Sequence, residues 1–135
     1  MASASDEAEY TLETSSIQMF NVGSWNAKNN PDGGSWWNNF RGIYLVNHFL
    51  ANSDNLDLEM YRLNPDDIGH EQYQNRLDNI KRWKYEVRFL RAYFYFELIK
   101  RYGGVPVITR PVEIGDSFPR NTLAVSYTHL TLPTT

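Results

Sequence analysis

Side chains suited to ligand binding gather in one stretch of the sequence, residues 21–40. Tryptophan rings can stack on the apolar C–H face of a sugar, and amide and carboxylate groups can hydrogen-bond to its hydroxyls. The stretch is also rich in Asn, Asp, Gly and Pro, which favour turns, and loops carry binding sites disproportionately. The sequence therefore predicts a sugar-binding loop, with these candidate residues: Trp25, Asn26, Asn29, Asn30, Asp32 and Trp36.

The tryptophans of this stretch also allow a purely structural interpretation. Trp36 and Trp37 stand where a helix is expected to begin, so their rings can anchor that helix in the core. For Trp37 we favour the core. For Trp25 both interpretations, ligand binding and packing, stay open.

Residue types needed for catalysis or metal binding are missing or scattered. The 135-residue chain has no cysteine, which excludes disulfides, thiolate metal sites and cysteine nucleophiles. His48, His70 and His129 are far apart, and Asp66 and Asp67 are adjacent in a polar connector, which is typical of a cap or turn. We therefore expect no metal, no cofactor and no enzymatic activity. A net charge of −3 argues against nucleic acid as a partner.

The first of two expected helices follows the candidate loop. Ser35 can cap a helix that runs from about Trp36 to Ala51. Residues at the helical period fall on one stripe of it: Trp36, Phe40, Ile43, Asn47 and Leu50. Asn47 is expected to face inward and to bond neighbouring backbone. The polar residues 53–70 predict a connector that holds at most a short turn of helix.

The second expected helix is long, from about Glu71 to Tyr102, with an interruption near Asn79 left open. Gly103 fits the left-handed position that closes a helix, and Pro106 prevents its continuation. An extended segment is expected after it.

Two apolar stripes run along this second helix, although a helix that buries one face needs only one. Neighbours are therefore expected on two sides, and its rings are expected in the core, including Phe89, Tyr93, Tyr95 and Phe96. Arg91 lies between the stripes and is expected to pair with Glu86 or Glu97 or to bond a carbonyl. The stripes are Ile80, Trp83, Val87, Leu90, Phe94 and Leu98, and Tyr85, Phe89, Ala92 or Tyr93, Phe96 and Ile99.

Both helices carry recognisable motifs. The first fits W-x-x-x-[YF]-x-x-I-x-x-x-N-x-x-[IL], and the second fits E-x-x-x-L-R-A-x-x-[YF]-[YF]-x-L-x-x-x-[YF]-G-x-[VI]-P at eleven positions without a gap. A downstream pair matches at Pro119–Arg120. The second motif is filled by Glu86, Leu90, Arg91, Ala92, Tyr95, Phe96, Leu98, Tyr102, Gly103, Val105 and Pro106. Together, over residues 36–122, these motifs resemble the SusD/RagB family of Bacteroidetes-type bacteria.

This resemblance implies an all-α fold of tetratricopeptide-like helical hairpins, present as the N-terminal part of a longer protein. It implies a non-enzymatic lipoprotein on the surface of the outer membrane. Such a protein binds an oligo- or polysaccharide or another nutrient and works with a TonB-dependent, SusC-like transporter. A signal peptide and a lipid-bearing cysteine are implied as well and are absent from this chain.

Two other functions stay open at this point. A helical-repeat scaffold would bind protein segments and have no sugar site. A fragment of an α-helical glycosidase would need a pair of catalytic carboxylates, which the sequence does not reveal.

The last residues of the chain are predicted not to belong to the natural protein. Residues 125–135, VSYTHLTLPTT, resemble the translation of a transposase-type sequencing adapter in reverse complement. We therefore predict a partial SusD-like helical domain at 1–124 and an artefactual tail at 125–135, with a natural reading frame that continues into a longer protein. The alternative is an ordinary threonine-rich tail.

Overall fold

The structure, a computed structural model, describes residues 4–5, 8–9, 11–12, 15–26, 28–62 and 67–131. These residues are mostly helical, as the sequence predicted. The chain divides into two compact units, Met1–Trp37 and Asn38–Thr135. No helix in the described part of the chain combines the length and apolarity that a membrane crossing requires.

The first unit holds little regular structure. Strands β1 (Ala4–Ser5) and β2 (Ala8–Glu9) pair antiparallel, and the short helix α1 (Gln18–Asn21) contacts β1. A pairing of two-residue strands is too short to stabilise a sheet by itself. The all-α class of the chain is therefore decided by its helices.

Helix α2 (Gly34–Asn52) matches the first predicted helix within two residues at each end. Ser35 lies inside its first turn instead of preceding it, so the helix begins earlier than expected. The connector contains the 3-10 turn η1 (Ser53–Asn55) and the short helix α3 (Glu59–Arg62). Asp66, which was expected in a cap or turn, lies outside the described residues.

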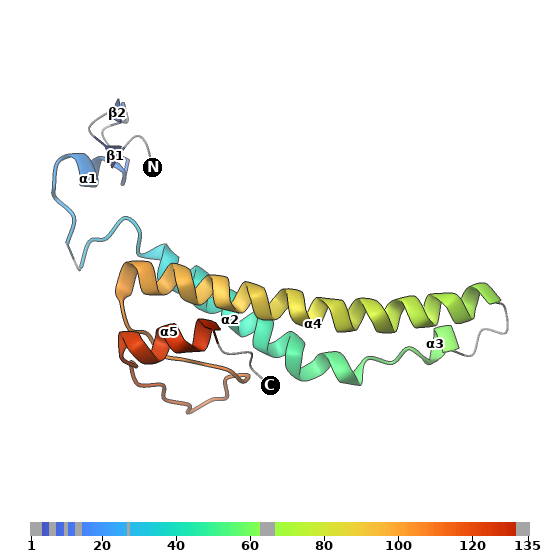
Figure 1. Cartoon of the computed structure of the whole chain (residues 1–135). Helices are drawn as coiled ribbons and strands as arrows, with labels where there is room; N and C mark the ends of the chain where they lie inside the picture. The colour runs from blue at the N-terminus through green and yellow to red at the C-terminus, as the bar shows by residue number, and fades with distance from the viewer. Residues whose placement is uncertain are drawn as a thin grey trace. The chain divides into compact units, whose positions relative to one another are not determined.

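Helix α4 (Asp67–Tyr102) is the longest element, with 36 residues, and its length is about 54 Å at 1.5 Å per residue. It begins four residues before the predicted start and is continuous through Asn79. Figure 1 shows it running back in the direction from which α2 came, as in a helical hairpin. Near its beginning it contacts α3, where the Arg76 guanidinium lies 5.3 Å from the Tyr61 ring centroid.

The core of the second unit lies where α2 and α4 meet the chain after α4. A Cβ atom at Gly42 of α2 would lie 2.5 Å from the Phe94 ring of α4, so the missing side chain allows the two helices to approach closely. The buried apolar side chains are Ile43, Val46, Ile80, Tyr95, Leu98 and Val105.

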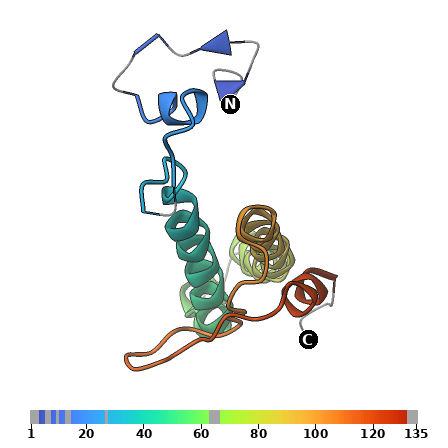
Figure 2. The same ribbon diagram turned by 90° about the vertical axis from the view of Figure 1, so that its left-hand side faces the viewer.

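The chain after α4 is extended and ends in helix α5 (Leu123–Thr131), which packs beside α4 (Figure 2). Residues 125–131 of the predicted tail thus belong to a helix, and Ser126 is fully buried. Its hydroxyl accepts a hydrogen bond from the Val105 N–H at 3.0 Å. The adapter origin of these residues stays a prediction.

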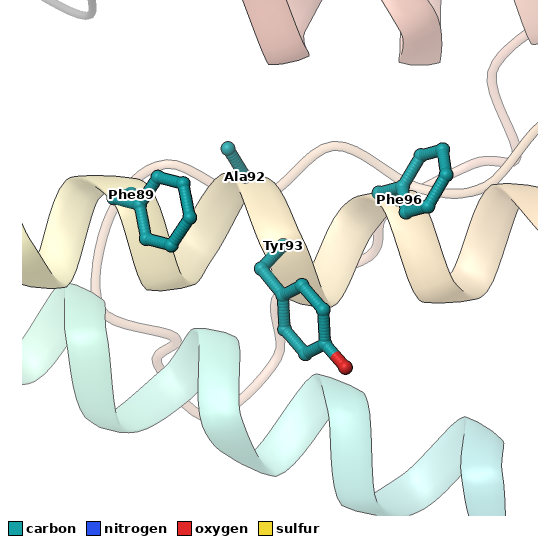
Figure 3. A pocket seen from close by; sticks show the side chains of 4 residues that line it. All are labelled: Phe89, Ala92, Tyr93 and Phe96. Atoms are coloured by element: carbon teal, nitrogen blue, oxygen red, sulfur yellow. The ribbon is translucent and has the colours of Figure 1, made fainter.

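Several aromatic side chains expected in the core are exposed. Tyr95 is buried, but the rings of Phe89, Tyr93 and Phe96, shown in Figure 3, are 71%, 49% and 46% exposed. Trp37, for which we favoured the core, is 74% exposed. These side chains are not in the core that the described residues form, and for α4 only one of the two expected neighbours is present among the described elements. The described elements cover only one side of α4.

Candidate functional site

The candidate loop folds into turns that its own asparagines stabilise. The backbones of Asn26 and Asn29 form an isolated bridge with N–H to O distances of 3.0 and 3.1 Å. The Asn26 Oδ1 atom also accepts hydrogen bonds from the N–H groups of Lys28 and Asn29, at 2.9 and 3.0 Å. Asn30 Oδ1 accepts one from the Asp32 N–H at 2.9 Å. These oxygens shape the loop, and the side-chain NH2 groups can still donate to a ligand.

Trp25 presents its ring at the start of this loop. It is 52% exposed, and its ring centroid lies 5.9 Å from that of Phe20 at an interplanar angle of 47°. A ring supported on one side and open on the other can stack on a ligand. The sequence analysis missed Phe20, because a five-residue spacing to Trp25 is neither a helical nor a strand period.

Asp32 and Trp36 lie where the loop enters α2. The Ser35 hydroxyl hydrogen-bonds to the Asp32 carboxylate, and the Ser35 N–H donates to the Asp32 carbonyl at 3.0 Å. Trp36 is half-buried in the first turn of the helix. All candidate residues therefore belong to the first unit, within the segment 25–36. Their role as ligand-binding residues stays a prediction.

The motif residues of the two helices meet in a different place, at a buried group that we call the polar clasp. It consists of the side chains of Asn47, Arg91 and Tyr95 and the backbone of residues 108–110. Asn47 donates from Nδ2 to the carbonyls of Ile108 and Arg110, at 2.9 and 3.2 Å. Arg91 donates from Nη1 to Asn47 Oδ1 at 2.7 Å.

Tyr95 completes the polar clasp. Its hydroxyl accepts a hydrogen bond from the Ile108 N–H at 2.6 Å and lies 3.2 Å from the Ile108 carbonyl, to which it can donate. Burial raises the pKa of Tyr95 to about 12 and lowers the pKa of Arg91. The polar clasp therefore fixes the extended segment against α2 and α4, which is a structural task.

The glutamates expected as partners of Arg91 pair with other residues. Glu86 lies 3.4 Å from Arg82, and Glu97 lies 2.6 Å from Lys100 and 2.5 Å from Arg101. Hydrogen bonds from these two cations lower the pKa of Glu97. The expectation of a glutamate partner is corrected in favour of the Asn47 amide, whereas the alternative expectation, a bond to a carbonyl, is met by the Thr109 carbonyl at 3.5 Å from Arg91 Nη1.

The end of α4 is held by the arginine of the downstream motif. Gly103 has a φ of 71°, the left-handed conformation that ends a helix. Arg120 donates from Nη2 to the Tyr102 carbonyl at 2.8 Å and from Nε to the Gly104 carbonyl at 2.6 Å. These bonds satisfy carbonyls that the helix leaves open at its end, and Pro106 follows in the extended chain.

Polar groups that would indicate metal or catalytic chemistry are not gathered in the described part of the chain. There, no three His, Cys, Asp or Glu side chains lie close enough together to hold a metal ion. Every buried side-chain nitrogen or oxygen among the described residues has a hydrogen-bond partner.

The fold is similar to part of a known structure. A SusD-like protein from Bacteroides fragilis matches 83% of this chain with a TM-score of 0.58 and 24% sequence identity. This likeness shows an all-α, SusD-like helical fold. The chain spans only 19% of the length of that protein. No protein-family model and no curated protein matches the sequence.

Proposed function

We propose that this chain is part of a non-enzymatic binding protein that captures glycans or other nutrients for a TonB-dependent transporter of the outer membrane. The observation that carries the proposal is the SusD-like fold of 83% of the chain. The motif at Glu86–Pro106 supports it as well, because it resembles the SusD/RagB family.

Capture would begin at the candidate loop of the first unit. Trp25 would stack on the apolar face of a sugar ring, with Phe20 behind it. The amide groups of Asn26 and Asn30 and the carboxylate of Asp32 would bond to hydroxyls. The loop is already ordered by its internal hydrogen bonds, so less conformational entropy is lost on binding. Trp36 would limit the site at the start of α2.

The complete protein is expected to be a surface-exposed outer-membrane lipoprotein that passes its ligand to a SusC-like transporter. Co-purification with a TonB-dependent transporter encoded beside its gene would support this partnership. Purification of the complete protein from outer-membrane fractions without any such transporter would contradict it.

Affinity gel electrophoresis of the complete protein in a panel of polysaccharides tests ligand binding. We expect retardation by at least one glycan and, for Trp25→Ala, affinity that is about tenfold weaker because a stacking ring is lost. Trp83→Ala is the matched control, since Trp83 is also an exposed tryptophan but lies on α4, outside the loop. Its affinity should not change.

The outcomes of this experiment separate the alternatives. Retardation that Trp25→Ala leaves unchanged would move the site away from the loop but keep the function. No retardation by any glycan, together with peptide binding, would favour a helical-repeat scaffold. Hydrolysis of a polysaccharide by the complete protein would favour a glycosidase.

A further inference from the structure

The Trp25 ring reaches the Phe20 ring only because the chain turns sharply between them. Helix α1 ends at Asn21. If the helix continued to residue 25, Trp25 would lie about 140° around the helix axis from Phe20, on a different side of the helix. In the structure the two ring centroids are instead 5.9 Å apart. The backbone between α1 and Trp25 must therefore redirect the chain.

Gly23 makes this turn. Its φ is 66°, which is the left-handed conformation. The Ser24 N–H donates to the Met19 carbonyl at 3.1 Å, and the Gly23 N–H donates to the Phe20 carbonyl at 3.4 Å. These two bonds are those of the Schellman motif, which closes a helix with a glycine in this conformation. Because the motif ends at Ser24, the backbone of Gly23 sets the direction in which Trp25 leaves the helix.

We propose that Gly23 is a positioning residue of the candidate site, whose left-handed backbone holds the Trp25 ring beside Phe20 and leaves it 52% exposed for a sugar to stack on. This inference rests on the proposed function, since it concerns how the same loop binds its ligand. A ring that is held in place before binding loses less conformational entropy when it stacks on a ligand. Gly23 acts through Trp25 and does not need to touch the ligand.

The space around Gly23 allows a substitution that changes only the backbone preference. Apart from its chain neighbours, a Cβ atom at Gly23 would have no atom within 4 Å. Alanine disfavours the left-handed conformation by about a factor of ten, whereas asparagine tolerates it. Gly115 provides the matched control, because its φ is 97° and a Cβ atom there would also have no atom within 4 Å. It lies in the second unit, outside the candidate loop.

Glycan affinity is the first measurement, made by affinity gel electrophoresis of the complete protein in a polysaccharide that retards the wild type. We expect Gly23→Ala to weaken the affinity by about threefold to tenfold, because a smaller fraction of molecules holds Trp25 ready for binding. Gly23→Asn should weaken it by less than about twofold, and Gly115→Ala should leave it unchanged. In a Trp25→Ala background, Gly23→Ala should have no further effect, since Gly23 acts through that ring.

The position of the ring can also be measured without any ligand. Fluorine NMR of protein labelled with fluorinated tryptophan gives a signal for each tryptophan, and the signal that disappears in Trp25→Phe belongs to Trp25. Phe20→Ala shows where this signal lies when the supporting ring is missing. We expect Gly23→Ala to move the Trp25 signal toward that position, and Gly23→Asn and Gly115→Ala to leave it in place.

Several results would overturn this inference and leave the proposed function standing. An unmoved Trp25 signal in Gly23→Ala would show that the glycine does not set the position of the ring. Unchanged glycan affinity of Gly23→Ala, or an equal loss in Gly115→Ala, would show that binding does not depend on this turn. A full further loss in the Trp25→Ala background would show that Gly23 does not act through Trp25. Absence of glycan binding by the wild type would instead contradict the proposed function, and with it any role of Gly23 in binding.

Discussion

One side of the C-terminal half of α4 is buried and partly polar, while the opposite side is exposed and aromatic. Arg91 and Tyr95 on the first side are 6% and 3% exposed, whereas Tyr85 and Phe89 on the second are 70% and 71% exposed. Apolar character alone therefore does not decide which side of this helix is covered. The polar side is covered because its groups find exact hydrogen-bond partners in α2 and the extended chain.

The cost of burying polar groups explains this difference. A buried group without a partner costs about 1–3 kcal/mol, and more if it is charged. The polar clasp avoids that cost by joining Arg91 to Asn47 and Asn47 to the backbone of Ile108 and Arg110. The exposed aromatic side of α4 does not carry this cost. An exposed ring lacks only the stabilising free energy that its own burial would contribute.

Arg91→Ala should have the largest effect on stability and tests whether the polar clasp holds the fold. The substitution leaves Asn47 Oδ1 buried and creates a cavity, so we expect the free energy of unfolding to fall by about 3 kcal/mol. Arg91→Leu should cost less, because it refills the volume without a charge. Urea unfolding followed by circular dichroism measures both.

Arg82→Ala is the control for this prediction. Arg82 is an arginine of the same helix in an exposed ion pair with Glu86, and such pairs contribute about 0–1 kcal/mol. If Arg91→Ala and Arg82→Ala reduce stability equally, the polar clasp does not stabilise the fold as proposed.

The sequence predicted the helices well because local signals define them. The 3.6-residue period predicted α2 within two residues at each end, and Tyr102–Gly103 marked the end of α4. The sequence also identified Asn47 and Arg91 as structural residues. The glutamates that it suggested as partners of Arg91 pair with other cations instead. The actual partner is 44 residues away, and no local pattern specifies such a contact.

Exposure and binding were harder to predict for a related reason. A stripe of apolar residues reveals a surface that needs a neighbour, but it does not reveal whether that neighbour lies in the same stretch of chain. The helical period therefore places Phe89 on an apolar stripe but does not say which part of the polypeptide covers that stripe. At the candidate loop, the composition indicated Trp25, whereas its support by Phe20 depends on a loop conformation that the sequence does not define.

Tyr95→Phe should have the second-largest effect on stability. It removes both hydrogen bonds of the hydroxyl to the Ile108 backbone, so we expect a loss of about 1–2 kcal/mol at neutral pH. Tyr85→Phe, at an exposed ring of the opposite side, should change stability by less than about 0.5 kcal/mol. Equal effects would contradict the difference between the two sides of α4.

The pH dependence sharpens this prediction. The pKa of Tyr95 is raised from 10.0 to about 12 by burial, so the folded state keeps the proton that the unfolded state loses. The stabilising contribution is therefore complete below pH 10 and is lost as the pH rises toward 12, by about 1.4 kcal/mol per pH unit. Wild type should lose its advantage over Tyr95→Phe in this range. A constant difference from pH 9 to 11.5 would contradict the role of the buried hydroxyl.

Arg120→Ala should have a smaller effect, of about 1 kcal/mol, because Arg120 bonds the carbonyls of Tyr102 and Gly104 from an exposed position. Arg120→Lys keeps the charge but cannot reach both carbonyls in the same way, so its stability should be intermediate. Hydrogen exchange of the last turn of α4 should accelerate in the same order. Equal exchange in all three proteins would show that the cap is unimportant.

Phe89→Ala should have the smallest effect on the stability of the 135-residue chain. It tests directly whether the aromatic side of α4 is uncovered there. A ring that is 71% exposed loses little burial, so we expect a change of less than about 0.5 kcal/mol. Leu98→Ala, at a fully buried residue of the same helix, should cost about 3 kcal/mol. If Phe89→Ala is strongly destabilising in the 135-residue chain, the exposed aromatic side of α4 is already packed, and the two sides of this helix do not differ as described.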